Sequence, residues 1–216
     1  MKKYFFLFVS ILLTLSSCLT ILHPLVTADN IITDRRIEGT WTDSDSKSIL
    51  VQRLMNSKMK DVFTNAKSEH WEYTKKDSAF YTKLYIITFR EKDLDYTWIA
   101  GLVKIKDQFY LTLSPEECLS SNGKEAYDLK RTKTASSVAK LTWKNNNSLS
   151  LGFLNGDHLK QIILNGKAKI KHEYDPLFGT FVITASSAEI SQFLEKYGTN
   201  ETLFKGGNAF TLTRKM

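Results

Sequence analysis

Residues 80–106, FYTKLYIITFREKDLDYTWIAGLVKIK, contain the clearest pair of strands in the chain. Apolar and polar residues alternate from Phe80 to Glu91 and again from Tyr96 to Lys106, with the short polar segment 92–95 between them. Such alternation is typical of half-buried β-strands, and two strands joined by a short polar segment predict an antiparallel hairpin. An antiparallel sheet is therefore expected at the centre of the fold.

The same alternation continues on both sides of this hairpin. The turn Asp107-Gln108 leads into the next strand, and Lys144 with three following asparagines joins a later pair, since asparagine tolerates the positive φ of tight turns. A polar excursion is expected over residues 114–135. The other predicted strands cover residues 49–55, 109–113, 138–143, 148–154, 168–174, 180–184 and 208–214.

Two short helices are predicted in the C-terminal half. The first covers about residues 157–164. The second begins at a capping box formed by Ser186 and Glu189, carries apolar residues at helical spacing, and ends at Gly198. The chain is thus expected to be mainly β, with about eight to ten strands that close into a barrel, because closure removes exposed sheet edges.

The first predicted strand opens with Gly39-Thr40-Trp41. This resembles the Gly-x-Trp start of lipocalin-type barrels, and the meander of hairpins followed by a late helix and a final strand also resembles that layout. The resemblance implies a single lipocalin-like, or calycin-like, antiparallel barrel in which the tryptophan fills the closed end. The wider pattern over residues 37–216 is similar to a group of uncharacterised small bacterial lipoproteins, which supplies no catalytic or ligand residues.

The N-terminus has the organisation of a secretory signal. Two lysines follow Met1, an apolar run extends from Tyr4 to Leu15, and small residues then precede Cys18. The sequence Leu15-Ser16-Ser17-Cys18 resembles a bacterial lipobox, which implies cleavage between Ser17 and Cys18 and acylation of Cys18. The expected organisation is a signal peptide (1–17), a lipidated tether (18–36) and a lipocalin-like barrel (37–216).

Two other interpretations of the leader stay open. One is plain secretion, and the other is an uncleaved signal anchor, because the run from Tyr4 to Leu22 is close to the length of about 20 residues that spans a bilayer. The small polar cluster around Ser16 and Ser17 favours a processing site over a helix centre.

Charge and cysteine content exclude some classes of function. The chain has 30 basic and 23 acidic residues, but its lysines and arginines are scattered and no nucleic-acid-binding module is visible. Nucleic acid is therefore not an expected partner. The two cysteines are Cys18 and Cys118, so acylation of Cys18 leaves no intramolecular disulfide. A monomer is expected.

No catalytic motif is present, and no metal or cofactor is expected. The four histidines, His23, His70, His158 and His172, do not share metal-ligand spacing on one element. Cys118 lies in a polar stretch beside two glutamates and is expected to be a bystander thiol. The chain is accordingly expected not to be an enzyme.

The aromatic residues are the candidates for ligand binding. Trp41, Tyr85, Trp98 and Phe109 are expected to line a cavity in the barrel, and the alternative for each is ordinary core packing. Further aromatic candidates for this wall are Trp71, Phe89 and Trp143.

The resulting hypothesis is a membrane-anchored lipoprotein with a non-catalytic binding role in the bacterial envelope, taking an apolar small ligand in its barrel. The alternative is a module with a filled barrel that binds or inhibits a protein or glycan of the envelope, and a hydrolytic enzyme is a third interpretation. The residue after Cys18 is Leu19 rather than aspartate. By resemblance to the sorting rule of diderm bacteria, this implies the outer membrane.

Overall fold

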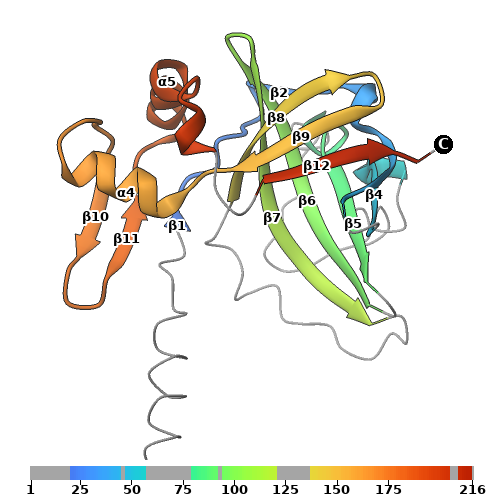
Figure 1. The fold of residues 1–216 in the computed structure, drawn as a ribbon, viewed down its shortest axis with the longest axis horizontal. Helices are drawn as coiled ribbons and strands as arrows, with labels where there is room; N and C mark the ends of the chain where they lie inside the picture. The colour runs from blue at the N-terminus through green and yellow to red at the C-terminus, as the bar shows by residue number, and fades with distance from the viewer. Residues whose placement is uncertain are drawn as a thin grey trace, which may run out of the picture.

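The computed structural model describes residues 20–44, 47–56, 79–91, 94–120, 137–204 and 209–215. Within them, eight antiparallel strands form a closed barrel (Figure 1). The final strand pairs with both the first and the seventh strand of the barrel, and no barrel edge is left unpaired along the ring. The barrel strands are β3 (Gly39–Thr42), β4 (Ser48–Arg53), β5 (Tyr85–Glu91), β6 (Leu94–Ile105), β7 (Gln108–Ser120), β8 (Ser137–Asn145), β9 (Ser148–Phe153) and β12 (Ala209–Arg214).

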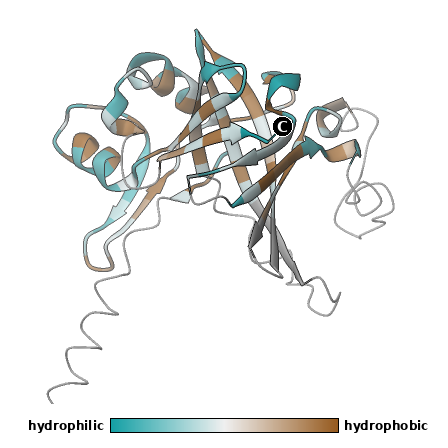
Figure 2. Cartoon of the chain, turned by 45° about the vertical axis from the view of Figure 1, so that its right-hand side comes forward, coloured by the Kyte–Doolittle hydropathy of each residue, from teal (hydrophilic) through white to brown (hydrophobic). Residues whose placement is uncertain are grey.

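The alternation of the sequence separates two hydrophobic cores. Along β7, Leu111 and Leu113 belong to the core inside the barrel, whereas Tyr110, which directly precedes Leu111, belongs to a second core on the outer face. Successive side chains of a strand point to opposite faces, so both cores draw on the same strands. Figure 2 shows hydrophobic and hydrophilic residues alternating along the barrel strands. The prediction of a mainly β fold with a closed barrel is confirmed.

A smaller layer of helices and strands covers the outer core and lies beside the barrel in Figure 1. Its three-stranded sheet has the order β1-β11-β10, with β1 parallel to β11. The two helices predicted for the C-terminal half are present as α4 and α5. The elements of this layer are β1 (Thr20–Ile21), α4 (Gly156–Leu164), β10 (His172–Asp175), β11 (Thr180–Ile183), α5 (Ser187–Tyr197) and the 3-10 helix η3 (Glu201–Leu203).

The end of α5 packs directly on the barrel wall. A Cβ atom added to Gly198 would lie 2.0 Å from the hydroxyl oxygen of Tyr110, so only glycine permits this close approach. Burial raises the pKa of Tyr110 to about 12. The predicted end of the helix at Gly198 therefore also sets the distance between α5 and β7.

The predicted capping box at the start of α5 is confirmed. The Ser186 side chain accepts a hydrogen bond from the backbone N–H of Glu189, and the Glu189 carboxylate accepts one from the backbone N–H of Ser186 over 2.8 Å. The same carboxylate forms an ion pair of 2.8 Å with Lys171 Nζ. These contacts, led by the bond from Lys171, lower the pKa of Glu189 to about 2.

We expect this carboxylate to make the fold acid-sensitive. Because its pKa is lower in the folded state, the stabilisation is complete above the ordinary glutamate value of 4.5 and is lost as the pH falls through about 2. Thermal denaturation between pH 5 and pH 2 should show a smaller loss of Tm for Glu189→Gln than for the wild type. Glu173→Gln, which removes another exposed carboxylate, should lose as much Tm as the wild type does. In 1 M salt the difference in Tm loss between Glu189→Gln and the wild type should become smaller, because the ion pair is exposed to solvent.

Residues 20–36 differ from the expected tether. Ile21, Leu25, Val26 and Ile31 are buried in the outer core, and β2 (Ile31–Ile32) pairs with β6. The close fit at Val26 depends on Gly101, where an added Cβ would lie 2.7 Å from Val26 Cγ1. The sequence predicted that these residues belong to a tether (18–36), whereas the structure packs residues of 20–36 into the fold. Periodicity detects regular helices and strands, whereas this irregular segment is held by burial of individual apolar residues.

Several strand boundaries also differ from the predictions. β5 begins at Tyr85 rather than Phe80, because residues 79–84 form a helical turn with a bond from Leu84 N to Tyr81 O. β10 begins at His172 because the chain at Lys167 and Ala168 still bonds back to α4. After β4 the chain forms a 3-10 turn, η2 (Leu54–Asn56).

The polar stretch after residue 113 begins as a strand rather than a turn. β7 continues to Ser120, and the backbone of Cys118 pairs with that of Tyr96 in β6. Pairing with the long strand β6 therefore keeps this polar stretch in the strand conformation. Residues 121–136, the remainder of the predicted excursion, lie outside the described residues.

Candidate ligand cavity of the barrel

The interior of the barrel holds a cavity of about 340 Å³. All eight barrel strands contribute to its wall, and the fifteen lining side chains are all aliphatic or aromatic. The lining residues are Ile37, Trp41, Ile49, Val51, Ile87, Phe89, Trp98, Leu111, Leu113, Leu141, Leu149, Leu151, Phe153, Phe210 and Leu212. Ligand pockets typically measure about 300–1,000 Å³, so this cavity suits a small molecule or one hydrocarbon chain.

Trp41 forms the base of the cavity. Its side chain is fully buried, and its Nε1 donates a hydrogen bond of 2.9 Å to the backbone oxygen of Ile37. The ring centre of Trp143 lies 6.3 Å away. The guanidinium of Arg214 lies 4.4 Å from the Trp41 ring centre, and that of Arg36 lies 4.7 Å from the Trp143 ring centre. This end of the barrel is therefore closed by two stacked cation–aromatic pairs.

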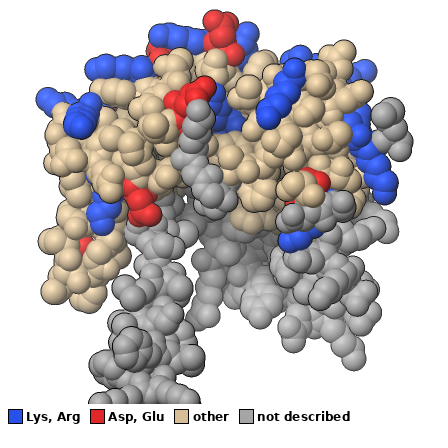
Figure 3. Space-filling view, viewed as in Figure 1, with Lys and Arg blue, Asp and Glu red and all other residues tan. Residues whose placement is uncertain are grey.

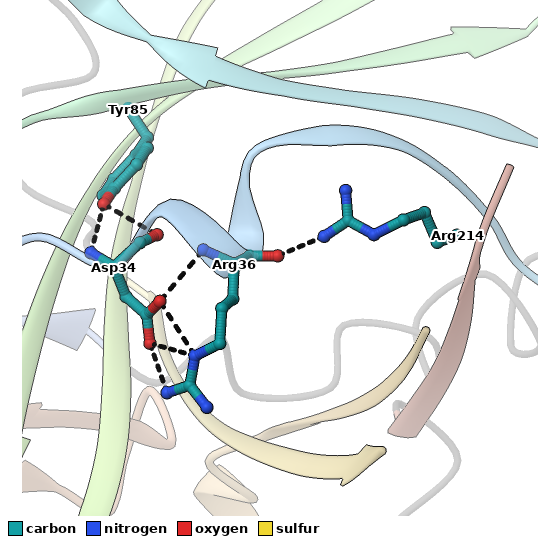
Figure 4. Close-up of polar contacts among 4 residues, drawn as sticks. All are labelled: Asp34, Arg36, Tyr85 and Arg214. Atoms are coloured by element: carbon teal, nitrogen blue, oxygen red, sulfur yellow. Dashed lines mark hydrogen bonds and ion pairs between the residues drawn. The ribbon is translucent and has the colours of Figure 1, made fainter. Parts of the chain in front are cut away.

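A polar network holds the closed end together (Figure 4). Arg214 donates to the backbone oxygens of Glu38, over 2.8 Å, and Arg36, which ties the last strand to the 3-10 helix η1 (Arg35–Ile37). The carboxylate of Asp34 accepts two bonds of 3.0 Å from Arg36 Nε, and this pairing lowers the pKa of Asp34. The chain entering the barrel is thus fixed across its base by charged groups that lie outside the cavity.

The opposite end carries the exposed part of the lining. Phe210 is 45% exposed and lies at the start of β12, whereas Arg214 lies at its end, over the base. The rings of Phe210 and Phe153 contact each other edge to face at 6.0 Å between centres. An apolar ligand would therefore enter past these two rings and would meet Trp41 at the far end.

Two of the four aromatic residues predicted to bind a ligand line the cavity. Trp41 lies at the base and Trp98 on the β6 wall. Tyr85 does not line it, although it is fully buried, because its hydroxyl accepts from Asp34 N over 2.7 Å and donates to Asp34 O over 3.2 Å. Burial raises the pKa of this hydroxyl. Tyr85 therefore follows the alternative of core packing, and its hydroxyl belongs to the network at the base.

Phe109 also lies away from the cavity. It is half-buried, packs against the barrel core, and has Lys104 Nζ 5.7 Å from its ring centre. Alternation correctly placed Phe109 on the inward face of β7, but it does not determine how far along the barrel axis the residue lies. On β7 the wall of the cavity begins two residues later, at Leu111. Of the further aromatic candidates, Phe89 lines the cavity and Trp143 does not. Ser17, Cys18 and Trp71 lie outside the described residues.

The aliphatic residues of the wall were not predicted, because all of the predicted binding residues were aromatic. Pairs spaced by two, such as Ile49 with Val51 and Leu149 with Leu151, share the inward face of their strands. This period-two spacing of branched residues is visible in the sequence and is the signal that would have identified them.

The described residues contain no cluster of metal-ligating side chains. Across those residues, no three histidine, cysteine, aspartate or glutamate side chains are placed to hold a metal ion together. His158 Nε2 contacts Thr202 Oγ1 at 2.9 Å and His172 Nδ1 contacts the backbone oxygen of Ile170 at 2.9 Å, so each imidazole has a local structural partner.

Among the described helices, none has both the length and the apolar character needed to cross a bilayer.

Comparison of the chain with protein-family models, with curated proteins and with solved structures gave no match.

Proposed function

We propose that this chain is a membrane-anchored lipoprotein of the bacterial envelope that binds an apolar small ligand inside its barrel. The observation that carries the binding role is the wall of fifteen apolar side chains around about 340 Å³. Transfer of a hydrocarbon ligand from water into such an interior is favourable by about 0.8 kcal/mol for each buried CH₂. The lipobox-like sequence ending at Cys18 supports the anchor, and Leu19 supports the outer membrane as its location.

The chemistry of the wall defines the class of ligand. An apolar cavity of about 150 Å³ accepts benzene, so this one, at about 340 Å³, has room for a longer group such as a medium-length acyl chain. The wall offers no group that donates or accepts a proton, so we propose binding without catalysis. A carboxylate or other polar end of the ligand would remain at the Phe210 end, where the lining is exposed.

Quenching of tryptophan fluorescence tests this proposal directly. A brominated medium-chain fatty acid that enters the barrel would lie against Trp41 and Trp98, so quenching should saturate and should be reversed by unbrominated decanoate. Leu113→Trp places an indole ring where the wall has a smaller aliphatic side chain. It should weaken binding of the fatty acid by at least about tenfold, while the circular dichroism spectrum is retained.

Leu50→Trp is the matched control for this experiment, because Leu50 lies on the outer face of β4 between Ile49 and Val51 of the wall. It should bind the fatty acid as the wild type does. Quenching that rises linearly without saturation, or that is equal in both variants, would exclude the cavity as the binding site. That result would favour the alternative of a module that presents its outer surface to a protein or glycan.

A further inference from the structure

The turn between β10 and β11 holds two large apolar side chains in solvent. Leu177 is 83% exposed and Phe178 is 76% exposed, and no other large apolar residue of the described chain exceeds 47%. The turn is well defined, because Asp175 Oδ1 accepts from the backbone N–H groups of Leu177, over 2.8 Å, and Phe178, over 3.2 Å. Neighbouring apolar side chains that are held in solvent, away from the core, indicate a site that contacts another apolar surface, such as a membrane or a protein.

The flanking residues suit the boundary between lipid and water. Tyr174, also partly exposed, contacts Phe181, and Lys160 Nζ lies 4.4 Å from its ring centre. Tyrosine and lysine combine an apolar body with a polar end, which favours the headgroup region. The hairpin projects away from α4 in Figure 1, and on the face drawn in Figure 3 the corresponding projection ends without a charged side chain. Residues 176–179 of the turn are all uncharged.

The register of the small sheet brings the N-terminus to the same end of the layer as this turn. β1 runs parallel to β11, with Thr20 opposite Val182 and Ile21 opposite Ile183. Because the strands are parallel, the chain that precedes Thr20 and the turn that precedes Thr180 approach from the same side. Cys18 is two residues before Thr20 in the sequence, so the chain length places it at most about 7 Å from Thr20. Thr180 is likewise two residues before Val182, the partner of Thr20.

We infer that the β10–β11 turn inserts Leu177 and Phe178 into the bilayer surface beside the acyl chains on Cys18. This inference rests on the proposed acylation of Cys18, and it adds a second contact with the lipid and a fixed orientation of the domain. With residues 20–36 packed into the fold, Cys18 cannot hold the domain far from the membrane. The turn therefore meets the surface whenever the anchor is inserted.

Site-directed nitroxide labelling measures the depth of this turn. The acylated chain that begins at Cys18 is reconstituted into vesicles of phosphatidylethanolamine and phosphatidylglycerol, with a label at Phe178→Cys or Leu177→Cys in a Cys118→Ser background. Burial of one such side chain favours the inserted state by roughly tenfold or more, so access of a water-soluble nickel complex to the label should fall by about that factor. Leu164→Cys is the matched control, since this exposed residue ends α4.

The control position lies away from the turn. Ile163 and Gly166, on either side of Leu164, share a surface groove with His172, at the opposite end of β10. Equal access of the nickel complex at positions 178 and 164 in an acylated chain overturns the inference, leaves the anchor intact, and makes the turn available to a protein partner instead. The mass of the N-terminal peptide is measured in the same sample, and a peptide without acyl chains overturns both the anchor and the inserted turn.

Discussion

Replacement of Trp41 by alanine is expected to lower the free energy of unfolding by about 3–5 kcal/mol. The indole is fully buried, donates to the backbone oxygen of Ile37, and lies under the guanidinium of Arg214. Alanine removes these contacts and enlarges a cavity that is already present. The neighbouring side chains cannot move in to fill the added space, so the full cost of the truncation is expected. Urea denaturation followed by far-ultraviolet circular dichroism measures the change.

Trp98→Ala provides the matched control. It makes the same truncation in the same cavity wall, but the ring is only half-buried, so the expected loss is about 1–2 kcal/mol. A double-mutant cycle of Trp41→Ala with Arg214→Leu should show a coupling of at least about 0.5 kcal/mol, because the two side chains are in direct contact. Equal losses at the two tryptophans, or additive effects in the cycle, would contradict the assignment of Trp41 and Arg214 as the closure of the base.

Replacement of Cys18 by alanine is expected to abolish incorporation of a radioactive fatty acid completely. The lipobox-like sequence places the only expected acyl acceptor at this position, and without its thiol neither the acyl chains nor the associated cleavage can follow. Labelling in growing cells, with the chain recovered by immunoprecipitation, measures this change. Several acyl chains on one cysteine give stable anchoring, whereas one chain alone is marginal.

Cys118→Ala is the control for this substitution, because it removes the second of the two cysteines of the chain and should leave labelling unchanged. An unlabelled wild type with a cleaved leader would indicate plain secretion, and an unlabelled wild type with an intact N-terminus would indicate a signal anchor. Label that persists in Cys18→Ala would place acylation elsewhere.

Local patterns were sufficient to predict the class of fold. The alternation in residues 80–106 requires one buried and one outer face, and the capping box with the apolar stripe after Ser186 specifies α5 with little dependence on the rest of the chain. The parallel pairing of β1 with β11 could not be predicted in this way. It joins two residues to a strand about 160 positions later, and its stability comes from burial of Ile21 rather than from any repeating pattern.

The sequence predicts which side chains face the barrel interior, but not where along the barrel axis the cavity lies. Alternation assigns Phe109 and Tyr85 to the inward face, yet both lie at the closed end rather than around the empty space. Height along the axis depends on the stagger of neighbouring strands, and the register of β4 with β5 is set by pairing rather than by residue type. Whether an interior is full depends on the summed volumes of facing side chains, which no single segment determines.

The pairing of β12 with β3 has a consequence for the order in which the molecule forms. Thr213 and Thr42 lie 171 positions apart and are partners in this ladder, so the ring cannot close before the final strand is available for pairing. Until then β3 and β9 each keep an open hydrogen-bonding edge, the kind of edge that pairs with other chains. Contacts this distant in sequence also slow folding. A chain with this topology is therefore most exposed to aggregation in the interval before its last strand pairs, and that interval would require protection by a chaperone or by rapid closure.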